Sequence, residues 1–179
     1  LAEQHFISFK PWLEPLVLAV AWLAGKLKGQ ARASALEQIA NGAPIIAKRL
    51  CGERWAWPVD GGLILADGRR LLGDSKTWRG IVIAPLATGL GALALDLPIL
   101  IGVVIGSAAM LGDLSSSFVK RRLGMASSSM APGLDQIPES LLPLLAVAGE
   151  FDLDALHIVL IVIGFIARAL ALFRPLSRL

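Results

Sequence analysis

Five polar residues that could do chemistry share one face of a predicted helix: Asp113, Ser116, Ser117, Lys120 and Arg121. The last four follow the first at i+3, i+4, i+7 and i+8, which is the spacing of a single helical stripe. Mg²⁺ in proteins takes one or two carboxylates together with phosphate oxygens, and lysine and arginine bind phosphate. The stripe therefore predicts a site for a metal-bound polyphosphate. Arg122 lies about 100° around the helix from Arg121, so we expect it to point toward lipid headgroups instead.

A second carboxylate, Asp135, lies where the chain turns back into an apolar segment. Together with Asp113 it could hold one or two divalent ions. Glu139 follows four residues later on the same helical face and could assist. Asp135 could instead cap the next helix, because aspartate is favoured near helix N-termini. Spacing alone leaves the ligand and the cap as equal alternatives.

Two more cations, Lys76 and Arg79, stand immediately before an apolar segment. They are helix neighbours at i and i+3, so both can reach one phosphate from the membrane interface. The alternative is a basic collar around Trp78 with no ligand. Further upstream, Asn41 and Pro44 interrupt an apolar stretch, either as a bend alone or to direct the Asn41 amide at a ligand.

Composition places these residues at a membrane. Of the 179 residues, 55% are hydrophobic and 17% are charged, with a mean hydropathy of +0.68, which excludes an ordinary soluble domain. The net charge of +3 does not indicate a nucleic-acid partner, because the basic residues flank apolar segments. The lone Cys51 permits no intramolecular disulfide, and two distant histidines make a zinc site improbable.

The sequence therefore predicts an all-α integral membrane protein with about five transmembrane helices in a single domain. Spans are expected at residues 5–25, 80–95, 97–118, 135–149 and 155–173, an interfacial or re-entrant helix at 31–50, and cytoplasmic loops at 51–79 and 119–134. Whether residues 31–47 form a further span stays open. In the first loop, Asp67 and Gly68 separate two apolar runs, which favours a type I′ turn and a small β-hairpin.

Lysine and arginine are distributed asymmetrically around these segments. They gather in the two loops and near the C-terminal end, whereas the turns at Asp96 and at residues 150–154 lack them. By the positive-inside rule, the loops and the C-terminus face the cytoplasm and the N-terminus lies outside. We therefore expect an active site on the cytoplasmic side of the cell membrane.

Four segments together resemble the CDP-archaeol synthase family, which is related to the CDP-diacylglycerol synthases. They are residues 40–44 (ANGAP), residues 73–80 (GDSKTWRG), residues 112–113 with 117–122 (GD and SFVKRR), and residues 134–136 (LDQ). The resemblance covers about residues 39–173 and keeps the segments in order beside the predicted spans. Two features depart from the family's pattern. Related synthases often carry a further acid shortly after the position of Asp135, whereas here the next acid is Glu139, four residues later. They also tend to have a basic, glycine-containing loop where this chain has residues 126–130 (ASSSM).

The resemblance implies a CTP-dependent cytidylyltransferase that converts a membrane lipid phosphate to a CDP-lipid and releases pyrophosphate, with Mg²⁺ as cofactor. Carried over residue by residue, it assigns metal binding to Asp113 and Asp135 and catalysis to these two with Lys120. The phosphate-binding set would be Asn41, Lys76, Arg79, Ser117, Lys120 and Arg121. The tails of the lipid, ether isoprenoid or diacyl, stay open, as does a homo-oligomer.

The partners expected on this basis are CTP, the lipid phosphate and membrane lipids. A non-enzymatic membrane scaffold, or an ion or lipid transporter, is the alternative, because intramembrane acids also mark ion pathways. Against it, the acids and cations gather at one membrane edge instead of threading the midplane.

Overall fold

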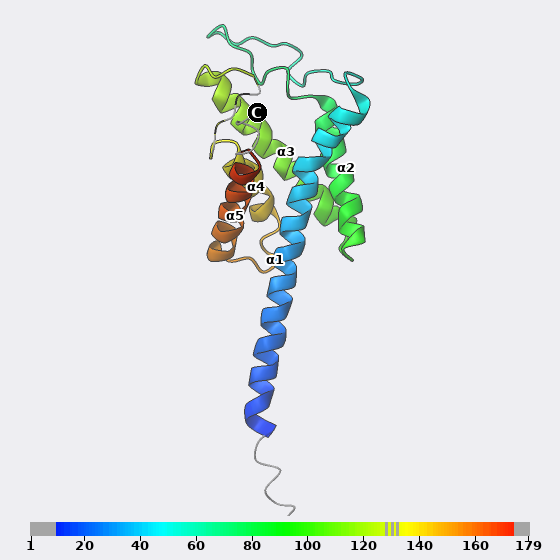
Figure 1. Cartoon of the computed structure of the whole chain (residues 1–179), viewed down its shortest axis with the longest axis vertical. Coiled ribbons are helices and arrows are strands. Elements are labelled where there is room, and N and C mark those ends of the chain that lie inside the picture. The colour runs from blue at the N-terminus through cyan, green and yellow to red at the C-terminus, as the bar shows by residue number, and fades with distance from the viewer. Residues whose placement is uncertain (1–9, 128, 130, 132, 174–179) are drawn as a thin grey trace, which may run out of the picture.

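The computed structural model is built from five α-helices (Figure 1). It describes residues 10–127, 129, 131 and 133–173, and the side chains of 28–127, 129, 131 and 133–167. The helices are α1 (Lys10–Cys51), α2 (Trp78–Ala94), α3 (Ile99–Arg122), α4 (Gln136–Ala146) and α5 (Ala155–Phe173). The all-helical prediction is thus confirmed for this part of the chain, and the basic residues before 123 belong to the last turn of α3, not to the second loop.

α1 differs most from the sequence prediction. The expected span at 5–25 and the separate helix at 31–50 are parts of one continuous helix of 42 residues, so the predicted break between them is wrong. Residues 5–9 lie outside the described part. At 1.5 Å per residue the helix is about 63 Å long, roughly twice the thickness of a bilayer's hydrocarbon core. Its N-terminal half projects away from the other helices, while its C-terminal half packs against α2 and α3 (Figure 1).

α2 and α3 form the antiparallel hairpin expected from the single charge between two apolar runs. Asp96 takes a positive φ of 55° in the turn, and Pro98 directly precedes α3. The two helices touch through small residues: a Cβ added at Gly102 would lie 2.1 Å from the carbonyl oxygen of Thr88. A Cβ at Gly106 would lie 2.2 Å from the Thr88 hydroxyl oxygen. Glycine at these positions therefore lets α3 lie directly on α2.

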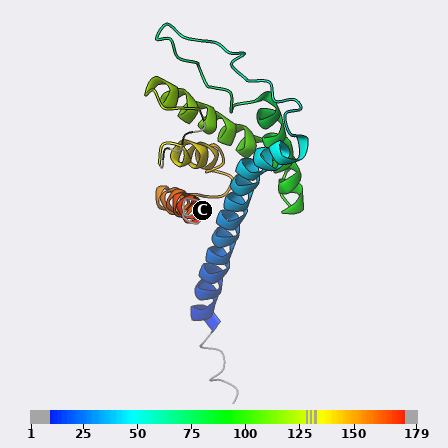
Figure 2. The same ribbon diagram turned by 45° about the horizontal axis from the view of Figure 1, so that its top comes forward.

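The helices α3, α4 and α5 lie side by side on one flank of α1, with α2 on the other (Figure 2). α4 has 11 residues and is about 17 Å long, so the span predicted at 135–149 is not confirmed as a membrane crossing. Among the described residues, α3 is the one helix long and apolar enough to cross a membrane, while Trp78–Ala94 and Ala155–Ala167 are shorter apolar helices. Five spans are therefore not confirmed.

The core and the outer surface are both apolar. Leu36 of α1, Ile105 of α3 and Leu144 of α4 meet in the buried core. Large apolar side chains such as Leu90 and Leu160 are exposed on the outside of α2 and α5. An apolar exterior of this extent suits a lipid environment better than water.

The loop between α1 and α2 reverses at the predicted position without forming strands. Ile64 and Arg70 make an isolated antiparallel bridge, and the Leu71 N–H donates to the Leu63 carbonyl at 2.9 Å. Gly68 has a positive φ of 73°, but Asp67 does not, so the type I′ turn is wrong. The β-hairpin is thus not confirmed, and within the described residues β pairing is limited to two isolated bridges.

Candidate active site

A cavity of about 540 Å³ lies where the C-terminal turns of α1 meet α2, α3 and the first loop. Its charged and amide-bearing wall residues include Asn41, Lys48, Lys76, Arg79, Asp113 and Glu139. Apolar side chains, among them Ile45, Ile81 and Leu114, form the rest of the wall. The cavity is therefore amphipathic, with charge and hydrocarbon in contact with the same space.

Asp113 is the centre of the cavity's charge. Its Oδ1 accepts a hydrogen bond from the Lys76 ammonium at 2.5 Å, and both side chains are partly exposed to the cavity. The carboxyl of Glu139 reaches Asp113 from α4 and makes a side-chain hydrogen bond with it. The approach is possible because a Cβ at Gly112 would lie 2.2 Å from the carbonyl oxygen of Pro138, so α3 and α4 touch through backbone atoms. Two carboxyl groups and one ammonium thus share one point.

Arg79 lies in the wall of the same cavity with its side chain buried. Its Nη1 donates to the carbonyl oxygens of Gly52 and Arg54, each at 2.7 Å. The guanidinium therefore fixes the start of the first loop to the N-terminal turn of α2. The predicted phosphate contact of Arg79 has to coexist with this structural role.

A second ion pair joins α3 to the segment before α4. Lys120 Nζ lies 2.6 Å from Asp135 Oδ1 and donates to the Ser129 carbonyl at 3.1 Å. Asp135 occupies the N-cap position of α4, but its side chain makes no cap hydrogen bond; Oδ2 accepts from the Ala131 N–H at 3.0 Å. Of the two alternatives left by spacing, the helix cap is therefore excluded, and the carboxylate faces a cation.

Several buried polar atoms near these pairs have no hydrogen-bond partner among the described residues. They include Asn41 Nδ2, Ser117 Oγ and Arg121 Nε. Leaving such an atom unpaired costs about 1–3 kcal/mol, so in a polar site it indicates a place for a ligand or water. All three belong to residues predicted to bind the nucleotide or phosphate.

The predicted residues therefore fall into two groups. Asn41, Lys76, Arg79 and Asp113 line the large cavity together. Ser117, Lys120, Arg121 and Asp135 do not line it, and Arg121 instead borders a smaller cavity of about 250 Å³ beside Arg69 and Arg70. Glu139 lies near members of both groups, because it contacts Asp113 and interacts electrostatically with Asp135. The sequence analysis predicted only that Glu139 could assist Asp113 and Asp135.

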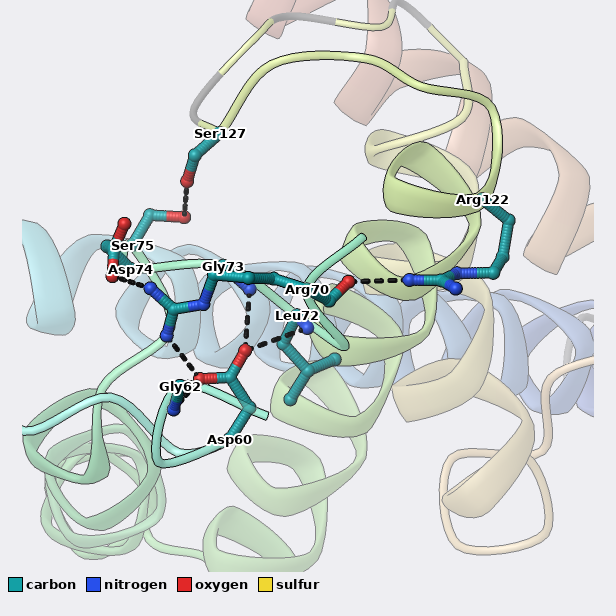
Figure 3. Close-up of polar contacts among 9 residues, drawn as sticks. All are labelled: Asp60, Gly62, Arg70, Leu72, Gly73, Asp74, Ser75, Arg122 and Ser127. Carbon is teal, nitrogen blue, oxygen red and sulfur yellow. Dashed lines mark hydrogen bonds and ion pairs between the residues drawn. The ribbon is translucent and has the colours of Figure 1, made fainter. Parts of the chain in front are cut away.

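Outside the cavity, the first loop is held by four charged residues, which we call the loop clasp: Asp60, Asp67, Arg70 and Arg122. Figure 3 shows Asp60, Arg70 and Arg122 of this set. The Asp60 carboxylate is fully buried and accepts from the Gly62, Leu72 and Gly73 N–H groups at 3.0 Å and from Arg70 at 2.5 Å. Arg70 also pairs with Asp74. No sequence feature had marked Asp60.

Burial by itself raises the pKa of Asp60, but hydrogen bonds to its charged form outweigh that effect. The donors are the Gly73 N–H, the Arg70 guanidinium and the Leu72 and Gly62 N–H groups. The net result is a pKa well below the ordinary value of an aspartate. Asp60 is thus charged at neutral pH and holds the loop through these contacts.

Arg122 corrects a sequence expectation. It was expected to point toward lipid headgroups, but its Nη1 pairs with Asp67 at 2.5 Å. Its Nη2 donates to the Arg70 carbonyl at 2.6 Å (Figure 3). The Arg69 guanidinium also donates a hydrogen bond to the Arg122 carbonyl. Arg122 therefore ties the end of α3 to the first loop.

The residues present suit Mg²⁺. Mg²⁺ needs only one or two protein carboxylates when substrate phosphates and water complete its shell. Asp113 and Glu139 already lie together in the wall of the cavity, and Asp135 lies near enough to interact with Glu139. Within the described residues, no three His, Cys, Asp or Glu side chains surround a common point in advance. Any such ion would therefore rely on substrate oxygens for much of its coordination.

Known proteins resemble this chain over most of its length. A protein-family model described as CarS-like CDP-archaeol synthase matches residues 46–174. The CDP-archaeol synthase of Aeropyrum pernix is 40% identical over 133 residues, which cover 68% of this chain and 70% of that protein. That of Pyrobaculum arsenaticum is 38% identical over 126 residues, with coverage of 68% and 75%.

A solved structure described as an intramembrane enzyme for archaeal membrane lipids biosynthesis also resembles the chain. The two share 34% sequence identity with a TM-score of 0.66, over 78% of this chain and 89% of the other. The likeness therefore extends over almost all of that enzyme. Since the family match spans most of the 179 residues, this membrane protein belongs to the CDP-archaeol synthase family.

Proposed function

We propose that this protein transfers a cytidylyl group from CTP to a membrane lipid phosphate, giving a CDP-lipid and pyrophosphate. The observation that carries the proposal is the amphipathic cavity, in which Asp113, Lys76 and Glu139 share the wall with apolar side chains. A substrate with a phosphate head and a hydrocarbon tail matches such a lining. The scaffold or transporter alternative is not favoured, because the comparisons all lead to lipid-synthesising enzymes.

In the proposed reaction, an oxygen of the lipid phosphate attacks the α-phosphorus of CTP. A new oxygen–phosphorus bond forms while the bond to the β-phosphate breaks, and the electron pair leaves with pyrophosphate. Lys120 and Arg121 would neutralise the triphosphate, and Asn41 and Ser117 would offer their unpaired atoms to the nucleotide. Lys76 and Arg79 would hold phosphate in the cavity. The chain's own residues thus supply positioning and charge.

We assign Mg²⁺ to Asp113 and Asp135, with Glu139 between them. When bound, the ion would supply charge neutralisation at the phosphate oxygens. Because Lys76 and Lys120 pair with these two aspartates, the two ammonium groups keep the carboxylates neutralised and oriented until a substrate arrives.

The decisive experiment uses purified protein, radiolabelled CTP and two lipid phosphates, one with isoprenoid ether tails and one with acyl tails. We expect labelled CDP-lipid and an equal amount of pyrophosphate, with product formation abolished by EDTA and restored by Mg²⁺. Comparing the two lipids also identifies the tail preference. Absence of product with either lipid would overturn the proposal.

We also propose that the active site faces the cytoplasm of the cell membrane, because residues 48–79 and the end of α3 hold ten of the 17 lysines and arginines. Ala66→Cys in the first loop and Asp96→Cys in the α2–α3 turn, each in a Cys51→Ser background, should react with a membrane-impermeant thiol reagent from opposite sides. Labelling of both from one side would refute this orientation.

A further inference from the structure

Three cations line the large cavity, and two of them are already engaged. The Lys76 ammonium bonds to Asp113, and the Arg79 guanidinium bonds to two backbone carbonyls. The third, Lys48, makes no side-chain hydrogen bond or ion pair with any residue whose side chain is described. It is therefore the cation whose charge is available to an incoming anion.

Lys48 belongs to a stripe on α1 that faces the cavity. Asn41, Pro44, Ile45 and Lys48 all line it, at i, i+3, i+4 and i+7. The stripe carries an unpaired buried amide at one end, an apolar centre, and an ammonium about 10 Å further along the helix. Such a surface offers two polar contacts separated by hydrocarbon.

The surroundings of Lys48 indicate which anion reaches it. Ile45 and Ile46 are each 59% exposed and Leu50 is 81% exposed, so the ammonium stands among side chains that suit lipid. A lysine can extend its stem along such a surface while its ammonium reaches the polar rim. CTP, which carries several charges and no tail, gains nothing from these apolar neighbours. A lipid phosphate can use both.

We propose that Lys48 binds the phosphate of the lipid substrate and thereby sets the affinity for that substrate. This inference rests on the proposed function. The attacking phosphate is then held from the α1 side of the cavity that Lys76, Asp113 and Glu139 also line.

Arg49 provides a matched control. Both residues are exposed cations in the last turn of α1, where a positive charge also interacts favourably with the helix dipole. Arg49 lies about 100° around the helix and does not line the cavity. A general effect of interfacial charge would therefore act through both residues, and phosphate binding through Lys48 alone.

The test measures steady-state kinetics of the parent, Lys48→Gln, Lys48→Arg and Arg49→Gln proteins, with lipid phosphate varied at saturating CTP and then the reverse. We expect Lys48→Gln to raise KM for the lipid phosphate about tenfold, as for loss of a charge-assisted hydrogen bond, with KM for CTP unchanged. Lys48→Arg should recover most of the affinity, and Arg49→Gln should match the parent. A second measurement compares binding of diacylglycerol phosphate and of diacylglycerol to each protein without CTP.

Two outcomes of the kinetic test would overturn the proposal. A rise in KM for CTP, instead of for the lipid phosphate, would assign Lys48 to the triphosphate. Equal effects of Lys48→Gln and Arg49→Gln would show that only the positive charge at the interface matters. If the parent shows no turnover, the proposed function fails, and the binding measurement still judges Lys48. If only Lys48→Gln loses the preference for diacylglycerol phosphate over diacylglycerol, the proposed role of Lys48 is supported. If this preference is unchanged in Lys48→Gln, the proposed role is refuted.

Discussion

The cavity and the loop clasp are both built from acid–base pairs, but their surroundings differ. In the clasp, Asp60 is fully buried and all its contacts are made within the chain. In the cavity, Asp113 is partly exposed, meets one ammonium and one carboxyl group, and borders open volume. The charges of the clasp are thus paired within the folded loop, whereas the charges of the cavity remain available to a ligand.

This contrast separates two kinds of arginine and lysine that a sequence shows as one class. Arg122 and Arg70 stabilise the loop, and Lys76 and Lys48 face the cavity. Substitutions in the two regions should therefore fail in different ways: the clasp in stability, the cavity in turnover.

The largest effect is expected for Asp113→Asn. The amide keeps nearly the same volume but removes a metal-binding charge, so turnover should fall at least about 100-fold while the melting temperature in detergent stays near that of the parent. Asp96→Asn is the matched control, since it makes the same change in the turn between α2 and α3. An active Asp113→Asn enzyme would show that the cavity's charge is structural, like that of the clasp.

Gly112→Ala tests the contact that brings the two carboxyl groups together. The added methyl group would meet backbone atoms of Pro138 and Glu139 at 2.2–2.7 Å, so α3 and α4 must separate. We expect a loss of about 1–3 kcal/mol in stability and reduced turnover. Gly164→Ala in α5, which has no atom within 4 Å of the new Cβ, should leave both unchanged or slightly improve stability. Similar behaviour of the two variants would contradict the close packing.

Asp60→Asn should affect stability with a defined pH dependence. Because the folded-state pKa of Asp60 is lowered, its charge stabilises the fold above the ordinary pKa of aspartate, and that stabilisation is lost as the pH falls below it. Thermal unfolding should show a deficit of about 1–3 kcal/mol at pH 7 that shrinks below about pH 4. Asp74→Asn removes the exposed partner of Arg70 and should change little. A deficit independent of pH would mean that the charge of Asp60 is not what holds the loop.

The smallest effect is expected for Arg122→Gln. Glutamine keeps donors for the Arg70 carbonyl but loses the ion pair with Asp67, which is partly exposed and therefore weak. Turnover should fall less than about fivefold, with unchanged KM for both substrates. A loss as large as that of Asp113→Asn would place Arg122 in the cavity's group and erase the distinction between the regions.

Local signals predicted much of the fold. The bounds of α5 agree with the expected 155–173, and the α2–α3 hairpin follows from one charge and a proline between two apolar runs. α1 was misjudged because the expected span 5–25 was ended just before Lys26, whereas α1 continues through this residue. A lysine can stand inside a helix, and it marks contact with water more reliably than it marks a helix end.

Spacing predicted which helix carries the candidate residues better than it predicted which of them meet. The stripe from Asp113 to Arg121 lies on α3, but Asp113 lines the large cavity and Arg121 borders the smaller one. Glu139 was placed with Asp135 by its spacing, but the contact of α3 with α4 at Gly112 brings it to Asp113 instead. The clasp joins Arg122 to Asp67 across 55 positions, and no local pattern records such a pairing.

The backbone contact at Gly112 has a mechanical consequence for an enzyme in a membrane. At Gly112 the backbone of α3 lies directly against the backbone at Pro138 and Glu139, with no room for a side chain between them. Asp113 directly follows Gly112 and Glu139 directly follows Pro138. We therefore expect the separation of these two carboxyl groups to change less than that of the helix ends when a thicker or thinner bilayer tilts α3 against α4.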